Sequence, residues 1–461
     1  MSAVNRRREW MAFWIVSSLL VVLALIQISM IFWEGTTPKS GEPLLESTTE
    51  DYSLIEPQNI YLSIRGNRDF LLIPDETGDQ QLLAGQAMDL LRLMMPSAMV
   101  QAYGASEKRI DRILPGTVMV MDLEQFRTSE ELRAEFSLPE NRVPAGSFDQ
   151  IWLVPALSVM EDVTVCFLNT QTGSVLEAVG GAYLTDENRD ILRNIMNLAS
   201  SVDADHLWQN DAFDGSFEKQ GFVRIAGHQS GARGSLDSPF LVDGAPAFTR
   251  MRRYGMSFFE FPDTVSEQIF LEDGAENSDT AAGFFFSNEK VTVRLSSDGH
   301  LIYVETLTEL EKEPVSLDQA YDIAVSFISR DMGFPGGEKA SWTLRETRRS
   351  GSDYVFCFDY KLDGLLLNMD RYLQDHTQME APLIVTVRGS KVCRYERMLT
   401  ALKQEEPAVL RYTWMEVADQ CAAEGIELLA PPSLVYEASF GQIFLYWKIE
   451  TPEGYLYRFA I

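Results

Sequence analysis

Four histidines are the side chains of this 461-residue chain best suited to bind a transition metal or to transfer protons at neutral pH. They are His206, His228, His300 and His376, and none is close to another in the sequence. No HExxH pattern and no pair of cysteines at zinc-binding spacing accompanies them. Asp203, Asp205 and His206 could form a metal cluster, but they follow a predicted helix and are more typical of a solvated turn. We therefore expect no metal and no cofactor.

Motifs for nucleophilic catalysis or phosphate binding are also missing. In GHQSG (227–231) the serine stands next to the second glycine, so the segment departs from the GxSxG nucleophile elbow. Residues 210–215 resemble a calcium loop, but Ala212 occupies a ligand position and the later glutamate is absent. The 68 acidic residues are too abundant for any two to be nominated as a glycosidase pair. We therefore expect a protein that is not an enzyme.

Arg250, Arg252 and Arg253 form a basic cluster in an otherwise acidic region. Two interpretations are open. The cluster can be a site for an anionic ligand, or a surface that forms local salt bridges. The second is the more usual role of a short run of charges.

A long apolar segment follows the arginines at residues 6–8. Residues 10–33 carry no charge, are long enough at about 1.5 Å per residue to cross a bilayer, and have aromatic residues at both ends. The positive-inside rule places residues 1–9 in the cytoplasm and the body outside. A cleaved signal peptide is the alternative, but its apolar part is shorter and ends in small residues. We expect an uncleaved single-pass anchor in a cell membrane.

Three residues of this segment could contact another membrane helix. Ser17, Ala24 and Gln27 are seven and three residues apart, which returns them to nearly the same helical face. Small and polar residues favour close helix packing and interhelical hydrogen bonds, and a glutamine amide facing lipid is costly. Either this stripe pairs laterally with another helix, or Gln27 simply lies near the outer interface.

The formal net charge of −29 comes from residues after the membrane segment, because residues 1–33 are net positive. Such a body repels nucleic acid and anionic membrane surfaces, so no nucleic-acid partner is expected. The charge is also typical of a protein that stays soluble in a crowded cell envelope. Four scattered cysteines are too few for a disulfide framework. Their scarcity favours the surface of a Gram-positive bacterium over a eukaryotic secretory lumen.

The pattern of the exterior predicts an α+β fold, with a single N-terminal transmembrane helix followed by a multi-domain body of antiparallel sheets and helices packed on one face. Residues 34–56, rich in Thr, Ser, Pro, Gly and Glu, are expected to form a linker. We expect three further parts: an N-terminal α+β domain at 57–202, a connecting domain with long loops at 203–285, and tandem α+β units at 286–461.

Local signals predict the elements. Capping boxes at Thr128, Ser316 and Thr413 indicate helix starts, and Gly425 is expected to end the last of these helices. Asp298-Gly299 predicts a tight hairpin. Further helices are expected at 82–95 and from Thr185. Strands are expected at 60–64, 70–73, 118–122, 149–154, 163–168, 175–178, 255–261, 284–295, 301–307, 342–348, 354–360, 383–387, 392–396, 442–449 and 455–460.

The layout resembles the YycH and YycI family, the membrane-anchored accessory proteins of the WalK/WalR cell-wall two-component system. A short basic N-terminus, one anchor and a long exterior carry the resemblance. Three segments add a similarity to PepSY-like units: EKVTVRLSSDGHLIYVETL (289–307), EPVSLDQAYDIAVSFI (313–328) and LIVTVRGSKVCRYER (383–397). Family members contact a sensor histidine kinase, largely through transmembrane helices. The resemblance implies such a kinase and a second single-pass accessory protein as partners, with Ser17, Ala24 and Gln27 as candidate contacts.

Two functions from different classes follow. The first is a non-enzymatic membrane-anchored regulator of a sensor histidine kinase. It would act by contact through its transmembrane helix and exterior domains. The alternative is an exported ligand-binding or inhibitor module of the PepSY type, for which the anchor is only a tether.

Overall fold

The computed structural model describes residues 53–63, 70–73, 79–104, 118–154, 163–180, 204–209, 221–225, 230–231, 234–242, 244–271, 282–331, 340–362, 364–404, 408–428, 432–439 and 441–460. These residues belong to one compact unit, Asp51–Ile461. The predicted anchor at 10–33 and the predicted helix from Thr185 lie outside them. Within the described part of the chain, no helix combines the length and the apolar character needed to cross a membrane.

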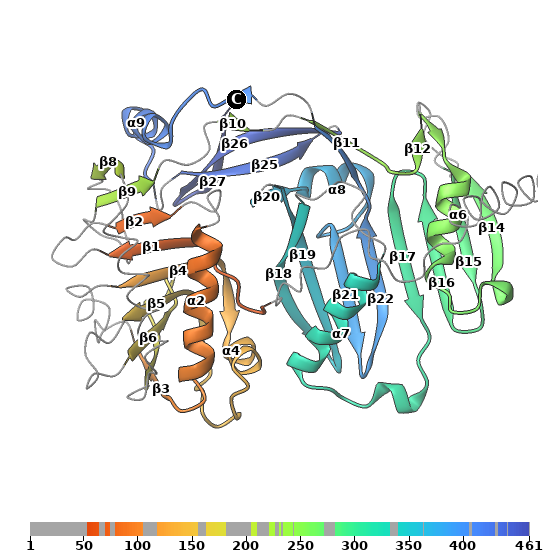
Figure 1. Ribbon diagram of the computed structural model, residues 1–461, viewed down its shortest axis with the longest axis horizontal. Coiled ribbons are helices and arrows are strands. Elements are labelled where there is room, and N and C mark those ends of the chain that lie inside the picture. Colours follow the sequence, from red (N-terminus) through yellow and green to blue (C-terminus); the bar gives the residue numbers. More distant parts are fainter. Residues whose placement is uncertain are drawn as a thin grey trace, which may run out of the picture. The chain divides into compact units, whose positions relative to one another are not determined.

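The first sheet has nine strands in the order β3-β7-β6-β5-β4-β1-β2-β9-β8 (Figure 1). Every pairing is antiparallel except that of β2 with β9. The strands are β1 (Asn59–Ser63), β2 (Phe70–Ile73), β3 (Met99–Tyr103), β4 (Met119–Thr128), β5 (Ser147–Val154), β6 (Val163–Leu168), β7 (Val175–Gly180), β8 (Ala204–Gln209) and β9 (Gly221–Ile225). The predicted pairing of 60–64 with 70–73 is confirmed.

Helices α2 (Asp79–Met94) and α4 (Ser129–Glu135) accompany this sheet. α2 buries one apolar stripe, since Leu83, Ala87, Leu90 and Met94 recur at helical spacing and are almost inaccessible. The predicted capping box of α4 is confirmed: the Thr128 side chain accepts from the Glu131 backbone, and the Glu131 carboxylate accepts from the Thr128 backbone.

The second sheet has fourteen strands, and its main path runs β14-β15-β16-β17-β22-β21-β19-β20-β25-β26-β11-β23. β18 pairs with β19, and β27 pairs with β26; the pairing of β20 with β25 is parallel. The strands are β11 (Gly234–Asp237), β14 (Ser266–Leu271), β15 (Ala282–Ser287), β16 (Val291–Ser296), β17 (His300–Glu305), β18 (Ala340–Ser350), β19 (Asp353–Leu362), β20 (Leu365–Asn368), β21 (Leu383–Arg388), β22 (Lys391–Met398), β23 (Ala401–Gln404), β25 (Ser433–Ser439), β26 (Gln442–Thr451) and β27 (Gly454–Phe459).

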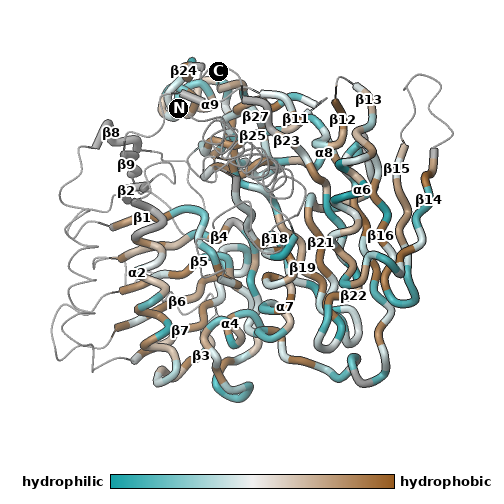
Figure 2. The backbone as a smooth tube through the Cα atoms, turned by 45° about the vertical axis from the view of Figure 1, so that its right-hand side comes forward, coloured by the Kyte–Doolittle hydropathy of each residue, from teal (hydrophilic) through white to brown (hydrophobic). Residues whose placement is uncertain are grey.

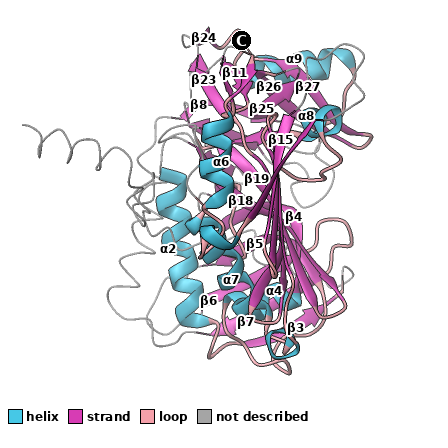
Figure 3. Ribbon diagram, turned by 90° about the vertical axis from the view of Figure 1, so that its right-hand side faces the viewer, coloured by secondary structure: helices cyan, strands magenta, loops and turns pink. Residues whose placement is uncertain are grey.

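Four helices accompany the second sheet: α6 (Phe248–Met256), α7 (Leu317–Arg330), α8 (Asp370–His376) and α9 (Trp414–Glu424). Helices α2, α6 and α7 lie on the same side of the strands (Figure 3). The predicted capping boxes at Ser316 and Thr413 are confirmed, and Gly425 ends α9 in the left-handed conformation at φ 73°. Short elements complete the fold: β10 (Ser230–Gly231) with β24 (Ala408–Val409), β12 (Leu241–Val242) with β13 (Ala245–Pro246), and the 3-10 turns Pro262–Thr264 and Glu309–Lys312.

The predicted hairpin at Asp298-Gly299 is confirmed as the turn between β16 and β17. Gly299 has φ 101°, and a Cβ atom there would lie 2.1 Å from the carbonyl oxygen of Leu399. Only glycine combines this backbone conformation with so close an approach.

Two strand predictions are wrong. Residues 255–261 are the end of helix α6 and the turn after it. Gly255, which weakens a helix by propensity, is required because a Cβ atom there would lie 2.1 Å from the ring of Phe286. Residues 284–295 form two strands, because the Asn288 side chain accepts from the backbone of Lys290 (2.9 Å) and Val291 (2.7 Å) and so closes a turn. Helix α8 was not predicted.

The described body is therefore α+β, with mostly antiparallel sheets and few helices, as expected. Strands from the predicted connecting region 203–285 join both sheets: β8 and β9 the first, β11, β14 and β15 the second. The domain boundaries themselves stay a prediction. Apolar stretches along the strands of both sheets (Figure 2) supply two large cores, and each core takes residues from both sheets.

Candidate functional site: the junction between the two sheets

The segment Ser53–Gln58, just before β1, lies between the two sheets. The Leu54 and Ile55 side chains are buried, although both residues belong to the predicted linker 34–56. The Leu54 N–H donates to the Glu135 carboxylate at the end of α4 (2.7 Å), and the Tyr321 hydroxyl of α7 donates to the Ser53 carbonyl (3.2 Å). This segment therefore contacts a helix of each sheet.

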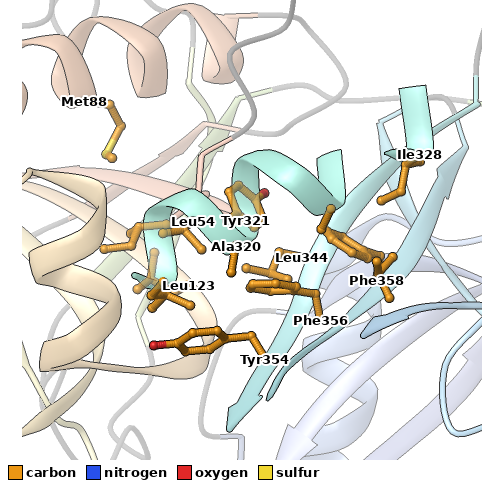
Figure 4. Close-up of a cluster of buried hydrophobic side chains, with 14 of the residues drawn as sticks. Leu54, Met88, Leu123, Ala320, Tyr321, Ile328, Leu344, Tyr354, Phe356 and Phe358 are labelled. Carbon is orange, nitrogen blue, oxygen red and sulfur yellow. The ribbon is translucent and has the colours of Figure 1, made fainter. Parts of the chain in front are cut away.

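The apolar side of the junction is a packed cluster with members from both sheets (Figure 4). Leu54 and Leu123 lie near Ala320 and Tyr321 of α7 and near the side chain of Leu344 on β18. All five residues are buried. Such close packing makes the position of the N-terminal segment sensitive to small shifts of either sheet.

The polar side of the junction is built around Glu56. One carboxylate oxygen pairs with the Lys361 ammonium (3.1 Å), and the other accepts from the Thr343 hydroxyl (2.6 Å). Thr343 and Lys361 are both buried, and the pairing of β18 with β19 places their side chains on one face. A buried ammonium group needs an anion, because desolvation of the charge is otherwise costly.

A charged hydrogen bond also joins the sheets through Arg127 of β4, whose side chain is buried. Its guanidinium donates to the Leu344 carbonyl of β18 (2.7 Å) and pairs with Glu131 (3.4 Å). Glu131 therefore both caps α4 and neutralises Arg127. Nearby, Glu130 accepts from the Tyr354 hydroxyl of β19 (3.2 Å), which links α4 directly to the second sheet.

The same face of β19 carries a titratable carboxylate, Asp359. Burial raises the pKa of Asp359 to about 6; the neighbouring Arg345 guanidinium opposes this rise, and Asp370 adds to it. Arg345 donates to Asp359 (3.3 Å) and to Asp370 (3.0 Å). The junction thus contains one group that changes charge in the mildly acidic range.

Another group of buried charges lies inside the second sheet, at the end of α7. Asp331 accepts from the hydroxyls of Tyr254 and Tyr395 and from the Arg397 guanidinium, each at 2.5 Å. Arg397 also donates to the Tyr360 hydroxyl (3.1 Å). Burial and the Asp331 charge hold the pKa of Tyr254 and Tyr395 far above the usual range, so both stay protonated donors.

The residues predicted as sites fall elsewhere. Ser17, Ala24 and Gln27 lie outside the described residues. The three arginines are on α6: Arg250 donates to the Pro239 carbonyl (2.6 Å), and Arg252 pairs with Glu267 of β14 (2.6 Å). Two of the three arginines thus have local partners, and the interpretation as an anionic-ligand site stays a prediction. Among the described residues, no group of His, Cys, Asp and Glu has the arrangement of a metal site.

Sequence reasoning missed Glu56, Arg127, Lys361, Asp331 and Arg397. A signal was present for one of them: Lys361 stands in the largely apolar strand pattern of β19, and a charge at such a position needs a buried partner. The identity of the partners could not be read, because they are distant in the sequence.

No family model matches the sequence, and no curated protein matches it significantly. The structure is similar to the crystal structure of YycH from Bacillus subtilis, with a TM-score of 0.48 and 10% sequence identity, over 87% of this chain and 95% of that chain. This match is to a member of the family that the sequence was expected to resemble. It says nothing of what this chain binds.

Proposed function

We propose that the protein is a non-enzymatic, membrane-anchored regulator that acts by contact with a membrane partner, a sensor histidine kinase. The proposal rests on one observation above all. The residues at the end of the predicted linker lie between the two sheets, where Glu56 pairs with the buried Lys361. The class of partner comes from the resemblance of the sequence to the YycH and YycI family.

A regulator of this kind must bind the active and inactive states of its partner with different affinity, because binding without such a difference shifts no equilibrium. The predicted anchor would supply contacts within the membrane, through Ser17, Ala24 and Gln27. The exterior would supply contacts outside. Since the segment Ser53–Gln58 contacts a helix of each sheet, we expect a change at this segment to affect both sheets.

The test is a two-hybrid assay in membranes against the sensor kinases of the host, with the full-length chain and a version whose residues 10–33 are replaced by polyleucine. We expect binding to one kinase that is lost with the polyleucine anchor. Binding that survives the replacement would move the contact to the exterior. Absence of binding to every kinase would refute the proposal and favour the alternative of a tethered PepSY-type module.

A second step tests the junction itself. Glu56→Gln removes the charge that neutralises Lys361, and we expect it to change the signalling output of the kinase while the kinase is still bound. Glu140→Gln, an exposed carboxylate outside the junction, is the matched control and should leave the output unchanged. Equal outputs from the two variants would show that the junction has no part in regulation.

A further inference from the structure

Strand β27 is an edge of the second sheet with an unusual surface. Among the described strands it pairs with β26 alone. Four of its six residues have side chains that are large, apolar or aromatic, and exposed: Tyr455 (49%), Leu456 (42%), Tyr457 (38%) and Phe459 (54%). An exposed apolar edge strand is a template for pairing with another chain, and most soluble proteins protect such edges.

The usual protections are missing from β27. The register with β26 is continuous from Gly454 to Phe459, without a bulge, and the strand contains no proline. Its one charged residue, Arg458, pairs with Glu424 (2.5 Å) and donates to Gln420 (3.1 Å), both on α9. That charge is therefore directed towards the helix on one face of the sheet.

The backbone of β27 offers hydrogen bonds at its outer side. The Ala460 N–H donates to the Leu445 carbonyl of β26 (2.9 Å). Because the N–H and C=O groups of an antiparallel strand alternate between its two sides, those of Tyr455, Tyr457 and Phe459 face away from β26. The three residues with outward backbone groups are the three aromatic ones.

Neighbouring aromatic rings hold these side chains in place. The Tyr446 ring lies 4.6 Å from that of Phe459 and 6.4 Å from that of Tyr457, and the Lys448 ammonium lies 4.5 Å from the centre of the Tyr455 ring. A surface ordered in advance loses less entropy on binding.

We propose that β27 pairs with β27 of a second copy of this chain, antiparallel, about a two-fold axis at Tyr457. In this register Tyr457 lies opposite Tyr457 of the second copy, and Tyr455 lies opposite Phe459. The outward backbone groups then face one another and can form about six hydrogen bonds. The pairing is isologous, as closed dimers require.

Self-complementarity is what favours a second copy over an unrelated strand. The register pairs aromatic residues only with aromatic residues, an arrangement that stabilises antiparallel strands. It also places Arg458 opposite Leu456, so no two like charges are directly opposed along β27. A single strand pair buries less area than a standard interface of about 1,600 Å², so the dimer is weak in solution. A membrane anchor would raise the effective concentration.

The experiment is disulfide cross-linking of the full-length chain in membrane vesicles, in a Cys393→Ser background because the other cysteines are buried. We expect Tyr457→Cys to form a covalent dimer under mild oxidation, since paired residues at hydrogen-bonded positions have Cα atoms about 5.5 Å apart. Leu456→Cys, which faces the other side and lies opposite Arg458, should cross-link at least tenfold less. A mixture of Tyr455→Cys and Phe459→Cys chains should cross-link to each other.

Equal cross-linking of the Tyr457→Cys and Leu456→Cys chains would indicate random collision and overturn the proposal, as would cross-linking of Tyr457→Cys to a different protein. A second readout, energy transfer between labelled full-length chains in vesicles, avoids new cysteines at the interface. Tyr457→Lys places two positive charges opposite each other and should weaken association at least tenfold. Phe261→Lys, an exposed aromatic residue (64%) outside the sheet edge, should not. Unchanged association of the Tyr457→Lys chain would overturn the proposal.

Discussion

Two groups of buried charge among the described residues are built in different ways. Around Asp331 and Arg397 every identified partner belongs to the second sheet or its helices, and both side chains are almost inaccessible, at 0% and 5% exposure. At the junction, the partners come from two sheets, and the Glu56 side chain is 41% exposed. The first group closes a core, whereas at the junction the Glu56 carboxylate stays in contact with water.

The difference in solvent access determines how much free energy is needed to separate the charged partners in each group. Breaking a fully buried ion pair leaves a charge without compensation in a low-dielectric core. At the junction, water can hydrate the charges of Glu56 and Lys361 once they separate. The free energy needed to break this pair is therefore smaller. We infer that the Asp331 group stabilises the fold of the second sheet, and that the pair of Glu56 with Lys361 is the easier of the two to separate.

The largest expected effect is the loss of Arg397. We expect Arg397→Met to lower the free energy of unfolding by about 3–5 kcal/mol, because Asp331 remains buried without its cation. The measurement is urea unfolding of the fragment 51–461. The double variant Asp331→Ala, Arg397→Met should lose less than the sum of the two single variants, since it leaves no unpaired charge. Additive losses would mean that the two groups do not interact.

The next effect is a dependence of stability on pH at the junction. The pKa of Asp359 is raised in the folded state to about 6, above its usual value, so folding favours the protonated form. The contribution of Asp359 to stability is therefore greatest below about pH 4 and is lost as the pH rises to about 6, by up to about 3 kcal/mol.

Unfolding in urea at pH values between 4 and 7 checks this dependence. Other carboxylates contribute with either sign, so the readout is the difference between the parent chain and Asp359→Asn. We expect the stability of the variant relative to the parent to rise with pH over this range. A difference that stays constant from pH 4 to pH 7 would contradict the raised pKa.

A smaller loss is expected at Arg127, which links β4 to β18. We expect Arg127→Met to cost about 2 kcal/mol, because it removes a charged hydrogen bond to the Leu344 carbonyl and leaves Glu131 without its cation. Glu131 keeps its hydrogen bonds in the capping box, which limits the loss. Arg133→Met, on a more accessible part of α4, is the control and should change stability by less than about 0.5 kcal/mol. Equal losses would mean that the link between the sheets contributes nothing.

Much of the fold was predictable because its signals are local. The capping box at Thr128 and the turn at Gly299 depend on residues within a few positions of each other, and both are confirmed. The wrong prediction at residues 255–261 has the opposite cause, because it depends on a residue that is distant in the sequence. Gly255 is tolerated in a helix only because Phe286 approaches it closely, and Phe286 is thirty-one positions away in the sequence.

The candidate site was not predictable for the same reason. Glu56 and Lys361 are separated by 305 positions, and Arg127 and Leu344 by 217. The residue types alone do not indicate which charged side chains pair, since the chain contains 68 acidic and 39 basic residues. Only the strand order that places β18 and β19 against the first sheet brings them together, and single-sequence patterns do not determine that order.

The smallest effect on stability is expected at Glu56. We expect Glu56→Gln to lower the free energy of unfolding by about 1 kcal/mol, since the glutamine can still accept from Thr343 while water replaces part of the interaction with Lys361. Unfolding of the 51–461 fragment in urea measures this loss, with Glu140→Gln as the unaffected control. A loss of stability as large as that of Arg397→Met would show that the junction contributes as much to folding as the Asp331 group does. A small loss together with a changed signalling output would separate the role of the junction in regulation from its role in folding.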